Sequence, residues 1–133
     1  MRIAALVIIT ASLCLTAFRN PPGALRFAEL AEKSLSDGDP ERALAYYSQA
    51  VATAPQSAAH YTARGFLLLK LKKYDAALAD FSAVIGLEPL KSSNYLTRGF
   101  VYSELKREKE AAADFATACS MGSRDGCSFA AMK

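Results

Sequence analysis

The chain has 133 residues, of which 52% are hydrophobic and 22% are charged, and its formal net charge is +3. This length allows one domain and a short targeting or anchoring segment, and the apolar fraction is too high for a disordered chain. When Arg2 and Arg19 are set aside, 14 basic residues remain against 13 acidic ones, a net charge of +1. That balance excludes the basic surface that nucleic-acid binding requires, so no nucleic-acid partner is expected.

The first element is a segment over residues 1–19 with the pattern of a signal peptide or an N-terminal membrane anchor. Residues 3–18 carry no charge and are flanked by Arg2 and Arg19. Sixteen residues are short of the roughly 20 that span a bilayer, but they fit the apolar region of a secretory signal. No clear cleavage site follows, so a cleaved signal and a retained anchor that contacts the membrane both stay open.

Lipidation of Cys14 is a third option for this segment. The residues before it, Ala-Ser-Leu, are similar to a bacterial lipobox, although that motif has a small residue directly before the cysteine and Leu13 is large. Residues 20–23 (Asn-Pro-Pro-Gly) cannot continue a helix and are predicted to be a linker. The structured domain is therefore expected to begin near Ala24.

A period of 34 residues runs through the rest of the chain. The motif Tyr61-x-x-x-Gly65 recurs as Tyr95-x-x-x-Gly99, and Ala77-x-x-Asp80-Phe81 recurs as Ala111-x-x-Asp114-Phe115. One period earlier, the same positions hold Phe27, Ala31, Ala43 and Tyr47. The repeats therefore run over residues 24–57, 58–91 and 92–125, and residues 126–133 form a short C-terminal cap.

This repeat resembles the tetratricopeptide repeat family over about 102 of the 133 residues. In the second repeat, six residues have the order and spacing of the family signature: Tyr61, Gly65, Leu68, Ala77, Phe81 and Pro89. The resemblance implies an all-α fold in which each repeat is a pair of antiparallel helices and the three pairs stack into a right-handed superhelical solenoid. The small residues Gly65 and Gly99 are expected where the first helix of a repeat approaches the second closely.

Two ion pairs are predicted within repeats. Arg64 and Arg98 are each followed, sixteen residues later, by an aspartate, Asp80 and Asp114. In the first repeat both positions change together, to Leu30 and Tyr46. Residues that change together at a fixed separation indicate contact, so we expect Arg64–Asp80 and Arg98–Asp114 to be structural salt bridges.

The last residues, 126–133, are too few for an independent helix. Cys119 and Cys127 occupy positions that should be neighbours in this repeat, and two buried free thiols are one interpretation. The tail also resembles the disulfide-bridged repeats of the Sel1-like class, which implies a Cys119–Cys127 disulfide if the chain is exported. Two thiols lack the four ligands that zinc takes, so no metal is expected.

The sequence shows no catalytic constellation. His60 is the only histidine and is predicted to lie at the surface. No nucleophile motif, phosphate-binding glycine loop or carboxylate cluster with metal spacing is present. We therefore expect no enzyme activity, no catalytic residues and no cofactor.

In the tetratricopeptide family, one face of each first helix lines a concave groove that binds a partner. The positions matching that face, and predicted here to bind a protein or peptide, are Leu25, Ala28, Thr62, Phe66, Leu69, Leu96 and Phe100. None is one of the Lys, Asn or Arg residues with which some family members clamp a peptide carboxylate, so an apolar peptide or amphipathic helix is expected. The alternative is that Phe66 and Phe100 cover neighbouring helices or the N-terminal segment. Lys72 and Lys73 belong to a basic rim or to an ordinary solvated edge.

These patterns predict a non-enzymatic protein-interaction module or adaptor. The N-terminal segment predicts export, with the domain either in the bacterial periplasm or anchored in the membrane and facing the periplasm. Two alternatives stay open: a secreted Sel1-like repeat protein, and a small regulatory subunit of an envelope enzyme or secretion machine.

Overall fold

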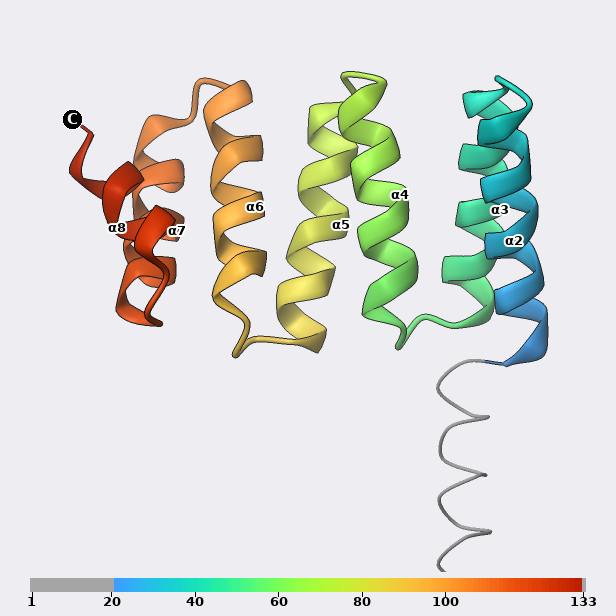
Figure 1. The fold of residues 1–133 in the computed structure, drawn as a ribbon, viewed down its shortest axis with the longest axis horizontal. Coiled ribbons are helices and arrows are strands. Elements are labelled where there is room, and N and C mark those ends of the chain that lie inside the picture. Colours follow the sequence, from blue (N-terminus) through green and yellow to red (C-terminus); the bar gives the residue numbers. More distant parts are fainter. Residues whose placement is uncertain (1–20, 133) are drawn as a thin grey trace, which may run out of the picture. The chain divides into compact units, whose positions relative to one another are not determined.

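The computed structural model describes residues 21–132, and every regular element in this range is an α-helix (Figure 1). The helices are α2 (Pro22–Ser36), α3 (Pro40–Thr53), α4 (Ala58–Lys70), α5 (Tyr74–Leu87), α6 (Ser92–Glu104), α7 (Glu108–Ser120) and α8 (Arg124–Ala131). The all-α class is confirmed. The chain divides between His60 and Tyr61 into two compact units, which are described separately. The right-handed arrangement of all three repeats stays a prediction.

The N-terminal predictions lie outside the described residues. These are the signal or anchor segment over residues 1–19 and the lipidation site at Cys14. Within residues 21–132, none of the helices has both the length and the apolar character that crossing a membrane requires.

The first unit is built on the hairpin of α2 and α3. Ala31 on α2 and Ala43 on α3 are both fully buried, since a methyl side chain lets the two helices approach closely. The Asp39 side chain caps α3 by accepting a hydrogen bond from the backbone N–H of Arg42 at 2.9 Å. Tyr47, buried on α3, donates its hydroxyl proton to Glu32 on α2.

Helix α2 begins at Pro22, so the predicted linker over residues 20–23 is wrong for its last two positions. The first N–H groups of a helix have no partner within the helix, and a proline at the first helical position therefore costs no hydrogen bond. Pro21 is the N-cap residue, and its carbonyl accepts a hydrogen bond from the N–H of Ala24 at 2.9 Å. Pro22 could not continue a preceding helix, but it can occupy the first position of α2.

The second unit contains the hairpins α4–α5 and α6–α7, followed by α8. The 34-residue period reappears in its core, where Phe81 is 2% exposed and Phe115 is 7% exposed. Each ring lies against a glycine of the preceding helix. A Cβ atom at Gly65 would be 3.0 Å from Phe81 Cζ, and one at Gly99 would be 2.6 Å from Phe115 Cε1. The close approach predicted at both glycines is confirmed.

The turn between the two helices of each hairpin has a left-handed residue at the same repeat position. These residues are Gly38 (φ 80°), Lys72 (φ 57°) and Lys106 (φ 59°). After α4, the N–H of Lys72 bonds to the carbonyl of Leu69 at 2.9 Å, and the N–H of Lys73 to that of Leu68 at 2.8 Å. This is the helix ending in which a left-handed residue satisfies the last carbonyls, and glycine usually occupies that position.

The predicted C-terminal cap over residues 126–133 is part of a helix, α8, which begins at Arg124. Ser123 caps it by accepting a hydrogen bond from the N–H of Gly126 at 3.1 Å. Gly126 is buried against α7, and an added Cβ there would lie 2.8 Å from the Ala118 Cβ. The residues are too few for an independent helix, but α8 is not independent because its packing on α7 stabilises it.

Candidate functional site

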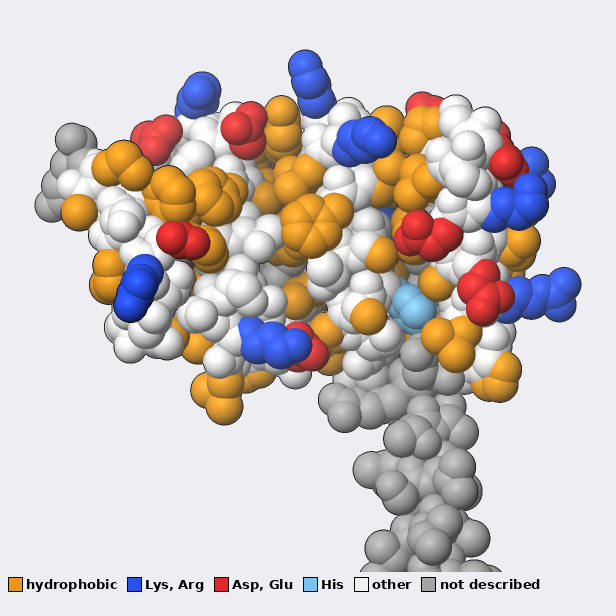
Figure 2. All heavy atoms as spheres, viewed as in Figure 1, with side chains coloured by type: hydrophobic (Ala, Val, Ile, Leu, Met, Phe, Trp, Pro, Cys, Tyr) orange, Lys and Arg blue, Asp and Glu red, His pale blue; other side chains and the backbone are white. Residues whose placement is uncertain are grey.

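Two aromatic side chains of the second unit are exposed at equivalent repeat positions. Phe66 on α4 is 53% exposed and Phe100 on α6 is 42% exposed. Figure 2 shows hydrophobic side chains gathered on one face of this unit, over the α4–α5 pair and towards α8. Burying apolar surface is favourable, so large exposed rings at two repeated positions mark a surface that can take a partner.

Each exposed ring is positioned by a buried one. Phe66 meets Phe81 edge to face, with ring centroids 5.2 Å apart and planes at 72°. Phe100 meets Phe115 in the same way, at 5.4 Å and 67°. Edge-to-face contact is a favoured geometry for two rings, and it fixes the orientation of the exposed one. Phe66 and Phe100 therefore contact the core from the side and still present much of their surface to solvent.

A third aromatic ring, that of Phe129 on α8, contacts Phe100 and was not singled out from the sequence. Its centroid lies 4.9 Å from that of Phe100 and 5.3 Å from that of Phe115. The signal that could have found it is the period itself. Phe129 follows Tyr95 by 34 residues, as Tyr95 follows Tyr61. Helix α8 thus corresponds to the first helix of a fourth repeat.

The other predicted groove residues divide between the two units. Thr62 and Leu69 on α4 and Leu96 on α6 are half-buried in the second unit, on the helices that carry the exposed rings. Leu25, which is 47% exposed, and Ala28, which is half-buried, lie on α2 in the first unit. A single groove that joins these two residues to the other five stays a prediction.

Both predicted ion pairs are present within the second unit. Arg64 donates to Asp80 from Nε at 2.9 Å and from Nη2 at 2.7 Å. The Asp80 side chain is 4% exposed and the Arg64 side chain is 22% exposed. The hydrogen bonds with Asp80 raise the pKa of Arg64 above its ordinary value. This two-pronged contact fixes α4 on α5, and so fixes the direction in which Phe66 points.

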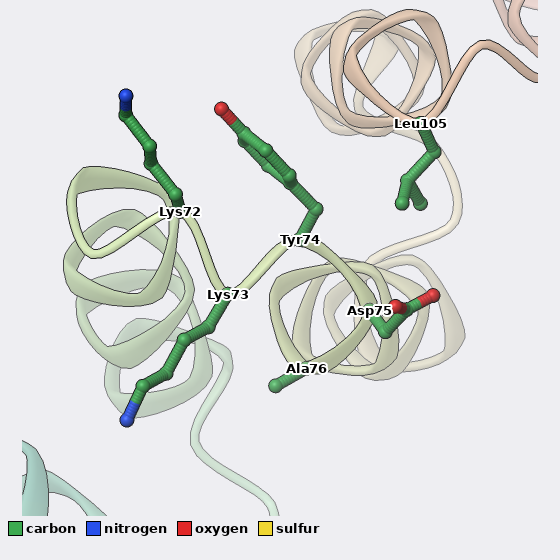
Figure 3. Close-up of a pocket in the computed structure, with 6 residues that line it drawn as sticks. All are labelled: Lys72, Lys73, Tyr74, Asp75, Ala76 and Leu105. Carbon is green, nitrogen blue, oxygen red and sulfur yellow. The ribbon is translucent and has the colours of Figure 1, made fainter.

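The turn after α4 contains a shallow pocket of about 380 Å³, shown in Figure 3. Its lining residues are Lys72, Lys73, Tyr74, Asp75, Ala76 and Leu105. The ammonium groups of Lys72 and Lys73 point away from each other, and the Asp75 carboxylate points away from both (Figure 3). Partial burial, together with a hydrogen bond to Glu104, raises the pKa of Tyr74. Basic and acidic side chains both line this pocket, so this edge is not a concentrated basic surface.

His60 is only 5% exposed, and the prediction that it lies at the surface is wrong. Its burial lowers the pKa of the imidazole. The sequence could not show this, because burial depends on contacts made in the folded chain. Within residues 21–132, no group of three or more His, Cys, Asp or Glu residues could hold a metal ion.

A disulfide joins Cys119 on α7 to Cys127 on α8, with their Cα atoms 4.5 Å apart. Cys127 is exposed and Cys119 is half-buried. The bond lies near the contact of Gly126 with α7, and Phe129 follows Cys127 by two residues. The disulfide therefore attaches α7 to α8, the helix whose Phe129 contacts Phe100.

Residues 60–89 match the family described as Tetratricopeptide repeat. Among solved structures, the second such domain of Spaghetti (RPAP3), bound to the HSP90 peptide SRMEEVD, is 26% identical with a TM-score of 0.67, covering 80% of this chain and 98% of that one. The second domain of human RPAP3, in complex with the HSP70 peptide SGPTIEEVD, is 24% identical with a TM-score of 0.69, covering 81% and 92%. The N-terminal domain of stress-induced protein-1 from C. elegans is 14% identical with a TM-score of 0.72, covering 79% and 89%.

No curated protein matches this sequence. The helix pairs, the repeat spacing and the structural similarity define a helical-repeat domain. Residues 60–89 carry a tetratricopeptide repeat, and the fold of the chain is similar to that of solved tetratricopeptide repeat domains. The resemblance of its tail to the Sel1-like class stays a prediction.

Proposed function

We propose that this chain is a protein-interaction module that binds an apolar peptide segment or an amphipathic helix on the face of α4 and α6. The observation that carries the proposal is the exposure of Phe66 and Phe100, each oriented by a buried ring. Aromatic side chains that enter a partner's apolar surface commonly supply most of the binding energy of an interface. Two of them, one repeat apart, suit a partner with apolar residues along one side.

The chemistry of this face favours an apolar partner over an acidic one. The peptides named in the two RPAP3 structures both end in Glu-Glu-Val-Asp, which is acidic. The predicted groove positions of α4 and α6 carry no basic residue: they are Ala59, Thr62, Phe66, Leu69, Ser93, Leu96, Phe100 and Ser103. A carboxylate bound among these side chains would lose its hydration without gaining a charged partner.

The proposed location is the bacterial cell envelope, in the periplasm or anchored at the membrane and facing it. The uncharged segment over residues 3–18 supports export. The pairing of Cys119 with Cys127 supports it independently, because disulfides persist in oxidising compartments and are rare in the cytosol.

The proposal is tested by fluorescence anisotropy with two labelled peptides. One is SRMEEVD, and the other is an amphipathic peptide of about 18 residues with Leu and Phe on one side and Ser and Gln on the other. We expect the amphipathic peptide to bind and SRMEEVD not to bind. The variant Phe66→Ala/Phe100→Ala should bind the amphipathic peptide at least about thirtyfold more weakly, since truncating one such anchor typically costs on the order of 2 kcal/mol.

Two controls separate binding from folding. Lys72→Ala/Lys73→Ala removes two charges beside the turn and should leave binding of this peptide, which has no charged side chains, unchanged at low and high salt. Phe66→Ala alone should lower the unfolding free energy far less than Phe81→Ala, because Phe81 is 2% exposed and Phe66 is 53% exposed. A folded aromatic double variant that binds as tightly as the wild type, or tighter binding of SRMEEVD than of the amphipathic peptide, would overturn the proposal.

A further inference from the structure

Helix α8 has eight residues and packs against α7 (Figure 1). Isolated helices shorter than about 12 residues are marginal in water, so α8 depends on α6 and α7 for its structure. Its only buried residue is Gly126, which has no side chain to pack. Phe129 is half-buried and supplies the ring contacts to Phe100 and Phe115. The Cys119–Cys127 disulfide adds a covalent connection to this packing.

The exposed Cys127 makes this bond reachable by a dithiol reductant. In the exchange, a thiolate of the reductant attacks one sulfur of the pair and the S–S bond breaks. The second thiol of the reductant then closes its own disulfide. Two electrons and two protons pass to the chain, and Cys119 and Cys127 become thiols.

We infer that the Cys119–Cys127 disulfide is a redox switch that holds α8 on α7 and thereby keeps Phe100 oriented for binding. This inference rests on the proposed function, because it concerns regulation of the same face. In the oxidised chain, Phe129 lies beside Phe100 and keeps that ring from moving towards α8. A side chain already in its binding orientation loses less entropy when a partner arrives.

Reduction removes the covalent connection between α7 and α8. For so short a loop, the chain-entropy model gives a change on the order of 50-fold in the opening equilibrium of the linked segment. When α8 separates, Phe115 and Ala118 lose the cover of Phe129 and Gly126. Phe100 then keeps its contact with Phe115 but loses that with Phe129, and it turns into the vacated space, where more of its apolar surface is buried. The face loses one of its two exposed rings.

The switch matches the route of an exported protein. In a reducing cytosol α8 is released and the face is inactive, whereas in an oxidising compartment the disulfide forms and the face becomes competent. The chain would therefore acquire its binding activity only after export.

The test uses the full chain in detergent micelles with Cys14→Ser, so that the third cysteine does not exchange with the pair. Hydrogen exchange is measured over residues 121–132 and, as an internal reference, over residues 74–104. Anisotropy is measured with the amphipathic peptide described above. Both measurements are made on the oxidised chain, on the chain reduced with dithiothreitol, and on Cys127→Ser.

We expect reduction and Cys127→Ser to speed exchange in α8 by on the order of 50-fold while α5 and α6 stay protected. Affinity for the peptide should fall at least about tenfold in both. Phe129→Ala with the disulfide intact should lower affinity similarly, while mass spectrometry still shows the bond. This variant separates the role of the ring from that of the covalent connection.

Unchanged protection of α8 after reduction would overturn the switch. Faster exchange in α8 with unchanged affinity would also overturn it, because release of the helix would then not alter the face. Failure of the oxidised chain to bind the peptide would count against the proposed function and against the regulatory role together. Failure of α8 to open, in a chain that does bind, would count against the switch alone.

Discussion

Arg98 on α6 donates two hydrogen bonds to Asp114 on α7, from Nε at 2.7 Å and from Nη2 at 2.8 Å, and Nη1 lies 3.3 Å from Ser82 Oγ on α5. The Arg98 guanidinium therefore connects α6 to α7 and also contacts α5 of the preceding helix pair. The Asp114 side chain is 7% exposed and that of Arg98 is 21% exposed. The carboxylate is thus the more deeply buried member of the pair.

This difference in burial predicts unequal effects of removing either member. Arg98→Ala should lower the unfolding free energy by about 3–4 kcal/mol, because it leaves a buried carboxylate without its partner. Asp114→Ala should cost less, since the longer Arg98 side chain can turn its charged end towards water. In urea denaturation, the loss of unfolding free energy in the double variant should be smaller than the sum of the two single losses by about 1–3 kcal/mol. Strict additivity, or a larger effect of Asp114→Ala, would contradict this account, and the Arg64–Asp80 pair offers a second cycle.

Three glycines of the second unit differ in the space around them, and that difference predicts opposite effects of Gly→Ala. At Gly99 the new Cβ would lie 2.6 Å from Phe115, so Gly99→Ala should destabilise by about 1–3 kcal/mol. At Gly65 the nearest atom is 3.0 Å away, and the cost should be smaller. Gly86 in α5 has no atom within 4 Å, so Gly86→Ala should stabilise by about 0.5 kcal/mol through helix propensity. Thermal and urea unfolding measure all three, and destabilisation by Gly86→Ala would be inconsistent with the argument.

The left-handed backbone of Lys72 predicts a stabilising substitution. A side chain in this conformation costs roughly 1–2 kcal/mol relative to glycine, which occupies the equivalent position at Gly38. Glycine also makes the unfolded chain more flexible, which offsets part of this gain. Lys72→Gly should therefore raise the unfolding free energy by about 0.5–1 kcal/mol. Lys73→Gly removes the same charge at a residue with φ −88° and serves as the control, for which no gain is expected.

Burial of His60 predicts a pH dependence of stability. Its pKa in the folded chain is lowered from 6.5 by burial, so the unfolded chain binds a proton more readily. Above about pH 6.5 both states are neutral at this residue, and its contribution to stability is fully present. As pH falls through 6.5 towards the folded pKa, the unfolded state gains protons first and stability is lost.

The comparison that isolates this effect is His60→Gln, because the other titrating groups are common to both proteins. Between pH 7.5 and pH 5 the wild type should lose more unfolding free energy than the variant does, measured by urea denaturation at each pH. A variant whose stability falls as steeply as that of the wild type would show that His60 does not contribute.

The helix pairs, the close approach at Gly65 and Gly99, and both ion pairs could be predicted from the sequence. These features depend on spacing. A 34-residue period places equivalent residues in equivalent positions, and two positions that change together from repeat to repeat indicate that their side chains are in contact. The cap by Asp39 and the first-turn proline after it are likewise local: Asp39 accepts a hydrogen bond within one turn of chain, and Pro40 has no N–H that needs a partner.

Other features were decided only by the tertiary structure. Helix α8 is too short to predict from its own residues, and it forms because Gly126 and Phe129 pack on neighbouring helices. His60 is buried although its sequence context indicated a surface position. Phe66 and Phe100 occupy partner-facing positions in the pattern, but their exposure follows from the rings beneath them. Periodicity determined which residues share a helix face, whereas burial is the sum of contacts from segments far apart in the chain, which no local pattern contains.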